Sequence, residues 1–233
     1  DREKGSVDII FQVVGATTMK LNAKQKGDAI CDFVGPLGKP TETEGIKKAC
    51  IVGGGVGCAI AYPVAKGLHD LGCEVTTIAG FRNKDLVILE KEFEEASDRF
   101  FRMSDDGTWG EKGVVTVPLK EMLEKGERFD TVIAIGPLVM MKFVTLETAK
   151  FGQKTTVSMN PIMIDGTGMC GCCRLTVTDA DGNKHTKFAC VDGPDFDAFT
   201  VDFDEAMMRN AMYSDFERRA REEECNLLKA EVK

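Results

Sequence analysis

Four side chains in the C-terminal third of the chain have the type and spacing of ligands to a metal cluster. The run DGTGMCGCC extends from Asp165 to Cys173, and Cys190 follows after sixteen further residues. Plant-type [2Fe–2S] sites use the spacing C-x4-C-x2-C with a distant fourth cysteine. Cys170, Cys173 and Cys190 fill the last three places, and Asp165 stands in the first. Because a carboxylate is an anionic donor that binds ferric iron, we predict a [2Fe–2S] cluster held by these four residues.

Other interpretations of this loop remain open. The cysteines could be buried free thiols, and a set of three thiolates and one carboxylate would also suit zinc. Disulfides would require an oxidising compartment, and nothing in the sequence indicates export. Cys172 is an alternative fourth ligand in place of Asp165, although its spacing from Cys170 and Cys173 is cramped.

The overall composition limits the class of protein. The chain has 233 residues, 43% of them hydrophobic, which allows one large domain or a few small ones. Its net charge of −8 argues against nucleic-acid binding, and no apolar run reaches the roughly eighteen residues of a membrane span. Nine cysteines without a visible signal peptide indicate a reducing, cytoplasmic location.

The first 44 residues have the composition of β-structure. Residues 7–14 and 27–34 are rich in β-branched and aromatic side chains and are predicted to be strands, with a turn at Gly15–Thr18. Two strands do not make a stable domain, so we expect residues 1–44 to be a hairpin packed on the neighbouring α/β region or the last part of a β-barrel. Since the chain starts without Met at strand-like residues, the barrel interpretation treats it as a fragment.

Residues 45–158 alternate between strand and helix patterns. A short buried strand leads into the glycine-rich turn GGGVG and a helix through Leu71, and this is followed by predicted strands at 73–80, 99–103, 114–117 and 130–136 and helices at 84–96 and 137–150. The alternation predicts an α/β fold with a doubly wound parallel sheet, whose ligand lies beyond the carboxyl ends of the strands. Glycines before a helix let backbone N–H groups approach a phosphate, so we predict dinucleotide binding. Helix packing alone is the alternative, since the spacing is not the strict G-x-G-x-x-G.

Three loops are expected to meet at that edge of the sheet: Gly53–Gly57, Gly80–Asp85 and Gly136–Met141. The second carries Arg82 and has no acidic residue at the strand end, which taken alone favours NADP over NAD. A solvated loop cation explains Arg82 equally well. Asp106, in a polar loop further on, is a candidate for the edge of the nucleotide site or a plain turn residue.

Residues 159–233 depart from the α/β pattern. Strands at 174–178 and 185–189 flank an Asp-Gly-Asn turn, which predicts a hairpin that returns Cys190 to the cysteine loop. A charge-rich helix is expected from residue 204 to residue 229. No histidine has a Ser or Cys partner in view, so we predict no catalytic acid or base.

The order of these features resembles a known family. A segment ending in GPLG, a dinucleotide-binding pattern and a C-terminal [2Fe–2S]-type loop occur in this order in electron-transfer subunits of dihydroorotate dehydrogenase, within the ferredoxin reductase-like family. The DGTGMCG run and the FACVDGP motif around Cys190 look closer to the small subunits of NADH-dependent reduced ferredoxin:NADP oxidoreductases, also called sulfide dehydrogenase subunits. The resemblance covers essentially the whole chain, although the family's Arg-x-Tyr-Ser/Thr flavin motif has no counterpart.

The resemblance implies an oxidoreductase subunit that passes electrons between NAD(H), FAD and a [2Fe–2S] cluster to a larger subunit with further flavin and clusters. Ferredoxin would be reached indirectly, in an electron-bifurcating complex, and NAD rather than NADP would be used. The alternatives are a dihydroorotate dehydrogenase subunit or a non-enzymatic zinc- and nucleotide-binding module. The resemblance implies that Gly15, Thr17 and Thr18 approach the FAD phosphates, and that the further cofactor-binding candidates Gly35, Pro36, Leu37 and Gly38 form the loop between the barrel and the nucleotide domain. It implies Gly53, Gly54, Gly55, Val56 and Gly57 for the dinucleotide pyrophosphate, and Gly136, Pro137, Met140 and Met141 near the nicotinamide.

Overall fold

The computed structural model describes residues 3–231 of the chain, with side chains through residue 223. The chain separates into two compact units, one made of residues 1–36 with 208–233 and the other of residues 37–207. Within the described part of the chain, no helix is both long and apolar enough to cross a membrane.

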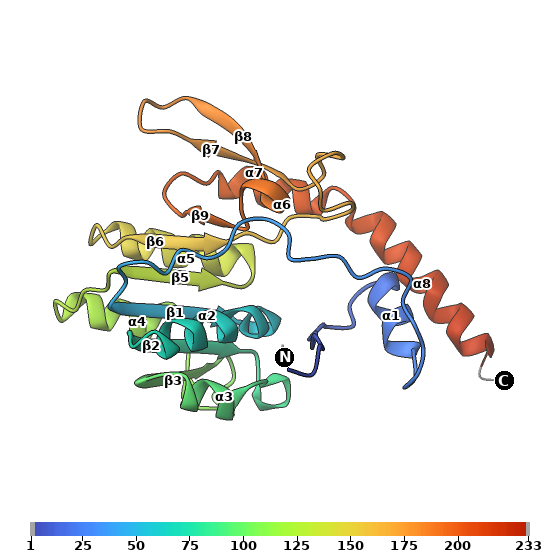
Figure 1. The fold of residues 1–233 in the computed structure, drawn as a ribbon, viewed down its shortest axis with the longest axis horizontal. Coiled ribbons are helices and arrows are strands. Elements are labelled where there is room, and N and C mark those ends of the chain that lie inside the picture. The colour runs from blue at the N-terminus through green and yellow to red at the C-terminus, as the bar shows by residue number, and fades with distance from the viewer. Residues whose placement is uncertain (1–2, 232–233) are drawn as a thin grey trace. The chain divides into compact units, whose positions relative to one another are not determined.

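A seven-stranded sheet in the order β4-β3-β2-β1-β5-β6-β9 is the centre of the larger unit (Figure 1). Its strands are β1 (Lys48–Gly54), β2 (Glu74–Phe81), β3 (Arg99–Ser104), β4 (Glu111–Lys112), β5 (Thr131–Ile135), β6 (Thr155–Ser158) and β9 (Asp195–Asp197). Neighbours are parallel from β4 to β6, whereas β9 pairs antiparallel with β6. The predicted parallel sheet is thus confirmed except at this edge, where the sheet is mixed.

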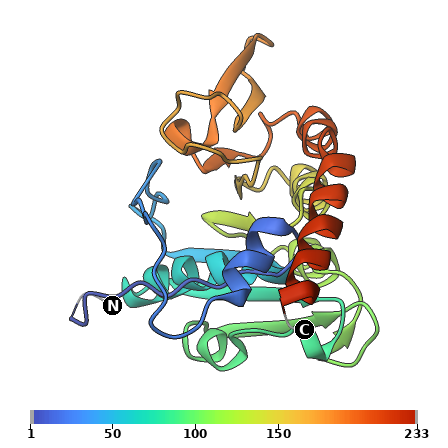
Figure 2. The same cartoon turned by 90° about the vertical axis from the view of Figure 1, so that its right-hand side faces the viewer.

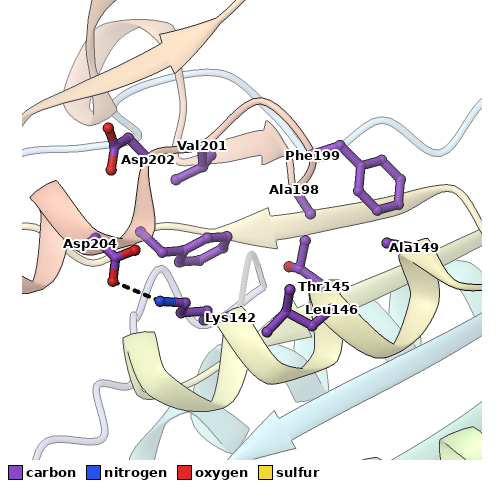
Figure 3. A pocket seen from close by; sticks show the side chains of 10 residues that line it. Lys142, Thr145, Leu146, Ala149, Ala198, Phe199, Val201, Asp202 and Asp204 are labelled. Atoms are coloured by element: carbon purple, nitrogen blue, oxygen red, sulfur yellow. Dashed lines mark hydrogen bonds and ion pairs between the residues drawn. The ribbon is translucent and has the colours of Figure 1, made fainter.

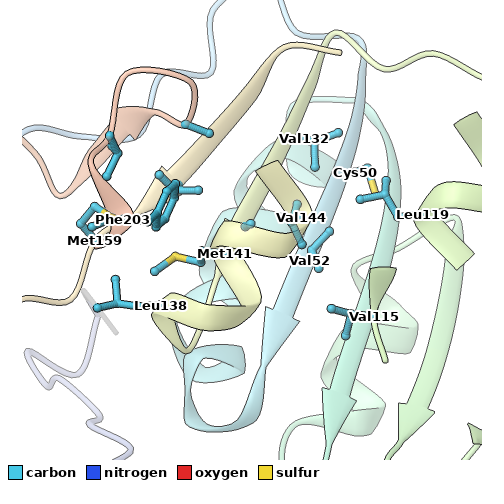
Figure 4. Packing of buried hydrophobic residues seen from close by; sticks show 14 of the residues in the cluster. Cys50, Val52, Val115, Leu119, Val132, Leu138, Met141, Val144, Met159 and Phe203 are labelled. Atoms are coloured by element: carbon cyan, nitrogen blue, oxygen red, sulfur yellow. The ribbon is translucent and has the colours of Figure 1, made fainter. Parts of the chain in front are cut away.

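Both faces of the sheet are buried by helices. Along β1, Cys50 and Val52 point into one hydrophobic core, and Ala49 and Ile51 point into the other, as the two-residue period of a strand requires. Helices α4 (Thr116–Glu124) and α5 (Leu138–Ala149) cover the first core, which Figure 4 shows. Helices α2 (Cys58–Asp70) and α3 (Glu90–Glu95) cover the second. Burial on two faces explains the nearly continuous apolar runs of the central strands.

Two predictions in this unit are wrong. The VVTV segment at residues 114–117 is not a strand, because α4 begins at Thr116 and Val115 packs into the first core. Pro118 lies in the first helical turn, where its missing N–H costs nothing. The helix predicted over residues 84–96 is α-helical only at its end as α3; the 3-10 turn η2 (Lys84–Leu86) precedes it, and Leu89 has a left-handed backbone that separates the two.

The predicted N-terminal strands are absent from the described residues. Residues 7–14 and 27–34 have no strand partner and expose their apolar side chains; Val7 is 70% exposed. A strand is stabilised by hydrogen bonds to a neighbour, so β-type composition alone does not produce one. The expected turn at Gly15–Thr18 is instead the start of α1 (Ala16–Ala23), where the Thr18 hydroxyl accepts a hydrogen bond from the Gly15 N–H (3.1 Å).

The cysteine-bearing segment begins and ends at one edge of the sheet. Ser158 pairs with Asp195 across β6 and β9, and the Met159 N–H donates to the Pro194 carbonyl (2.9 Å). Between them, β7 (Arg174–Thr178) and β8 (Lys184–Phe188) form the predicted hairpin, which Figure 2 shows standing above the sheet. The short helix α6 (Ala189–Asp192) comes directly after the hairpin.

The C-terminal region holds two helices where one was predicted. They are α7 (Phe203–Ala211) and α8 (Ser214–Glu231). Phe203, the first residue of α7, is buried in the first core, which anchors this helix to the larger unit.

Gln153, which lies between α5 and β6, pairs with the buried backbone groups of Phe129. These hydrogen bonds yield a stability prediction. Its side chain, 3% exposed, accepts from the Phe129 N–H (3.0 Å) and donates to the Phe129 carbonyl (2.7 Å). Gln153→Met should leave both groups unpaired and lower the free energy of unfolding by about 2 kcal/mol. Chemical denaturation measures this change, with a Met substitution at the exposed Gln12 as the control. An effect of Gln153→Met no larger than that of the control would contradict the assignment.

Candidate functional site

The Asp165 carboxylate organises the start of the cysteine loop. One of its oxygens accepts hydrogen bonds from the N–H (2.9 Å) and the hydroxyl of Thr167, and the other accepts from the Cys170 N–H (2.9 Å). These bonds, the Thr167 hydroxyl foremost, hold the pKa of the Asp165 carboxyl well below its usual range. The loop therefore presents an ionised carboxylate five residues before the first cysteine, although the side chain is exposed.

The hairpin brings the last two candidate ligands together. The sulfur atoms of Cys173 and Cys190 are 3.2 Å apart, and both side chains are buried. The Ala189 N–H donates to the Cys173 carbonyl (3.2 Å), so the two cysteines flank the base of the hairpin. The hydrogen bond with Cys173 raises the pKa of the Cys190 thiol. The predicted return of Cys190 to the cysteine loop is confirmed.

Cys170 and Cys172 form a second sulfur pair. Cys170 is exposed, and its sulfur accepts a hydrogen bond from the Cys172 N–H (3.5 Å). The interaction with Cys170 raises the pKa of the Cys172 thiol. Across the described residues, no group of three His, Cys, Asp or Glu side chains converges closely enough to hold a metal ion as it stands. Asp165, Cys170 and Cys172 are thus linked by hydrogen bonds at the start of the loop, whereas Cys173 and Cys190 contact each other at the base of the hairpin. The choice between Asp165 and Cys172 as a ligand stays a prediction.

The chemistry of this donor set fits a [2Fe–2S] cluster. Three thiols, which would lose their protons on binding iron, and a carboxylate already held in its anionic form would supply four anionic donors, the number that two irons require from the protein. Cys172 contributes its backbone N–H to the Cys170 sulfur, which is the kind of hydrogen bond that tunes a bound cluster.

The structure has the expected arrangement of loops at the carboxyl ends of the parallel strands, and we call this end of the sheet the dinucleotide edge. Gly54 of β1 is in register with Gly80 of β2, and Gly53 is in register with Ile135 of β5. The three glycine-containing loops therefore start at one edge, beyond the carboxyl ends of adjacent parallel strands. This is where α/β proteins bind ligands.

The glycines of the first loop have different roles. A Cβ atom on Gly57 would lie 2.7 Å from the Ile135 carbonyl oxygen and 2.8 Å from the Gly136 Cα, so this glycine permits close backbone packing. Gly55 has a φ of +54° and no neighbour within 4 Å of a Cβ position. Gly55 is therefore the glycine of this loop that has open space beside it. Val56 lies beside it in the 3-10 turn η1 (Gly55–Gly57) and is 42% exposed.

The two methionines of α5 also differ. Met140 is half-buried, and its thioether contacts the positions that Cβ atoms on Gly54 and Gly136 would occupy. Met141 is completely buried in the first core. Met140 is thus placed to line the dinucleotide edge, whereas the side chain of Met141 packs in the interior. Pro137 is the N-cap of α5 and contacts Gly54.

Arg82 and Asp106 lie on two loops that are joined by hydrogen bonds. The Asp106 N–H donates to the Arg82 carbonyl (3.3 Å), and the Lys84 N–H donates to the Thr108 hydroxyl (2.9 Å). The Asp106 carboxylate accepts from the N–H (2.9 Å) and hydroxyl (2.7 Å) of Thr108, which lowers the pKa of its carboxyl. The ionised Asp106 carboxylate therefore lies beside the loop that carries Arg82, the cation on which the sequence-based preference for NADP rests.

Sequence reasoning missed a residue that fixes this corner. Glu90 accepts hydrogen bonds from the Trp109 indole N–H (3.0 Å) and from Arg102 Nε (2.9 Å). The bond holds Trp109 against Phe81, at the end of β2, in an edge-to-face contact. Only the fold brings Glu90 to Trp109, so no local sequence signal could have identified it.

The residues implied for the FAD phosphates and for the loop after the barrel are divided between the two units. Gly15, Thr17 and Thr18 lie at the start of α1, with Gly35 and Pro36 in the same unit. Leu37 and Gly38 begin the larger unit, where Gly38 packs against the Gly193 backbone. Their role in cofactor binding stays a prediction.

A pocket of about 320 Å³ lies between α5 and the connection from β9 to α7 (Figure 3). Leu146, Phe199 and Phe203 give it apolar walls, and the Lys142–Asp204 ion pair (2.6 Å) lies at one side. None of the residues predicted to bind a cofactor lines this pocket.

Comparisons with known proteins show what the chain is similar to. Residues 160–202 match the iron–sulfur cluster binding domain of dihydroorotate dehydrogenase B. A Thermotoga maritima homolog of the dihydroorotate dehydrogenase B (NAD(+)) electron transfer subunit is 47% identical over 216 residues, covering 93% of this chain and 74% of the relative. The subunit of that name from Streptococcus pneumoniae is 32% identical over 204 residues, covering 86% and 77%.

A solved structure extends the likeness to three dimensions. It is a chain of NADH-dependent reduced ferredoxin-NADP oxidoreductase, described for flavin-based electron bifurcation. It superposes with a TM-score of 0.82 at 46% identity, over 91% of this chain and 75% of that chain. The protein therefore belongs to the family of dihydroorotate dehydrogenase B electron-transfer subunits, as its motifs predicted.

The ligand assignment can be tested with three variants. Asp165→Ala should lose most of the iron, because one iron loses its fourth anionic donor, whereas Asp165→Cys should retain a cluster with a changed spectrum. Cys172→Ala should leave the iron content intact. Iron analysis and the EPR signal of the reduced protein measure these outcomes. Normal iron in Asp165→Ala together with loss in Cys172→Ala would assign the ligand to Cys172 instead.

Proposed function

We propose that this chain passes electrons between NAD(H), FAD and a [2Fe–2S] cluster to a larger partner subunit that bears further flavin and clusters. We assign residues 45–158 to NAD(H) and the segment after residue 158 to the cluster. The observation that carries the proposal is the loop in which Cys170, the Cys173–Cys190 pair and the ionised Asp165 are assembled on the edge of a dinucleotide-type sheet. The likeness to the ferredoxin-NADP oxidoreductase chain supports an electron-bifurcating complex, with ferredoxin reached through the partner.

A bound FAD would supply the conversion between the two-electron chemistry of NADH and the one-electron chemistry of the cluster. The residues of this chain contribute binding and orientation. The backbone at Gly55 and the N-terminus of α2 offer N–H groups to a pyrophosphate, and Met140 limits the space beside Gly54 and Gly136. Hydride transfer needs mainly positioning, so the lack of a predicted acid or base is consistent with it.

NAD(H) is the proposed nucleotide. An adenosine 2′-phosphate adds negative charge, which the ionised Asp106 beside the Arg82 loop would repel. The same carboxylate is suited to accept hydrogen bonds from ribose hydroxyls. This charge balance agrees with the family and opposes the inference drawn from Arg82 alone.

The second candidate is the electron-transfer subunit of a dihydroorotate dehydrogenase. The match of residues 160–202 and the relative from Streptococcus pneumoniae favour it. The site in this chain would perform the same steps in either complex, and the partner subunit would differ. Affinity purification from an extract of the native cells, with identification of the partner, separates the two.

The proposal as a whole is tested by the colour and metal content of the purified protein. An anaerobic preparation should show visible absorbance from an iron–sulfur cluster that bleaches when the protein is reduced. Iron and sulfide should be present in comparable amounts, and zinc should be absent. A colourless protein that contains stoichiometric zinc would establish the non-enzymatic alternative.

Gly55→Val tests the dinucleotide edge. A β-branched residue at φ +54° is strained and would place methyl groups where the backbone is open to the pyrophosphate, so NADH should bind at least about tenfold more weakly. Isothermal titration calorimetry measures the affinity. Gly72→Val is a matched control, because Gly72 has a φ of +82° and equally open surroundings but lies between α2 and β2, at the opposite edge of the sheet. Equal NADH affinities in the Gly55→Val and Gly72→Val variants would show that Gly55 does not contribute to dinucleotide binding.

A further inference from the structure

Residues 37–41, which we call the strap, lie along the segment that comes after Cys190. The Lys39 N–H donates to the Gly193 carbonyl (2.7 Å), and the Thr41 hydroxyl donates to an Asp195 carboxylate oxygen (2.6 Å). A Cβ atom on Gly38 would collide with the Gly193 carbonyl oxygen. The strap is therefore fixed by backbone and side-chain contacts to residues three to five positions after a candidate cluster ligand.

The first residue of the strap reaches the other end of the cysteine loop. The Leu37 Cδ1 atom lies 2.8 Å from the position of a Cβ atom on Gly166, directly after Asp165. Gly166 is buried, although its neighbours Asp165 and Thr167 are exposed. Leu37 thus covers the backbone at the Asp165 end of the loop while remaining 46% exposed itself.

We propose that Leu37 is a positioning residue for the cluster: it shields the Asp165 end of the loop from water and thereby sets the redox potential of the cluster. The inference rests on the proposed function, because it concerns the cluster assigned there. The rest of the strap holds Leu37 in place by its bonds to Gly193 and Asp195.

The direction of the effect depends on charge. Reduction of the cluster by one electron adds one negative charge, and water stabilises the more highly charged form better than an apolar side chain does. An apolar cover at one end of the loop therefore disfavours the reduced form and lowers the potential. Removing the cover should raise it.

The test compares Leu37→Ala with Leu86→Ala in the intact protein carrying its cluster. EPR-monitored redox titration should give an upward shift of the cluster potential in Leu37→Ala and no shift in Leu86→Ala. Leu86 is a matched control, since it is 43% exposed but comes after β2, which is separated from β6 by β1 and β5. If Leu37→Ala lost its cluster, Leu37→Val would carry the measurement with a smaller shift in the same direction.

A second variant tests the strap itself. Thr41→Val keeps the side-chain shape but removes the hydrogen bond to Asp195, so iron should be lost to a chelator faster than from wild type.

A potential in Leu37→Ala and Leu37→Val equal to that of wild type would overturn the inference while leaving the proposed function intact. A wild-type protein without any cluster would instead overturn the proposed function.

Discussion

The close packing of the first glycine turn against the end of β5 is the constraint on which the larger unit depends. Gly57 lies so near the Ile135 carbonyl and Gly136 that any side chain would separate the two segments. The contact brings the start of α2 to the carboxyl end of β5 and leaves Gly55 facing outward. Because β1 is buried on both faces, a shift at this point would disturb both cores. Packing and ligand access are therefore set by the same few residues.

The parts of the fold that depend on local patterns were predictable from the sequence. Buried strands alternating with amphipathic helices specify the parallel sheet, and its topology then requires the three loops to meet at one edge. The Asp-Gly-Asn turn specifies the hairpin, and the hairpin brings Cys190 to Cys173. In each case a local sequence signal specified the elements, and a general rule of topology then brought residues that are distant in the sequence close together.

The wrong predictions have a common physical cause. Local composition determined the conformation of a segment only where another segment was available to pair or pack with it. Residues 7–14 have the composition of a strand, yet no strand among the described residues lies beside them to form a sheet. Val115 to Val117 is β-branched, yet burial of Val115 in the first core and the start of α4 determine its conformation. The contacts of Glu90 with Trp109 and of Leu37 with Gly166 join residues distant in sequence, for which a single sequence contains no signal.

The antiparallel pair at the edge of the sheet closes the base of the cysteine-bearing segment. The chain leaves the sheet at Ser158 and returns at Asp195, directly opposite, and the Met159–Pro194 hydrogen bond closes its base. Removing the segment would nevertheless uncover part of the first core, because Cys173, Leu175 and Ala189 pack in it, and would break the backbone hydrogen bonds of β7 to Thr200 and Asp202. The segment is thus a wall of the core as well as the carrier of the cysteines, so changes in its sequence affect the packing of the sheet together with the candidate cluster ligands.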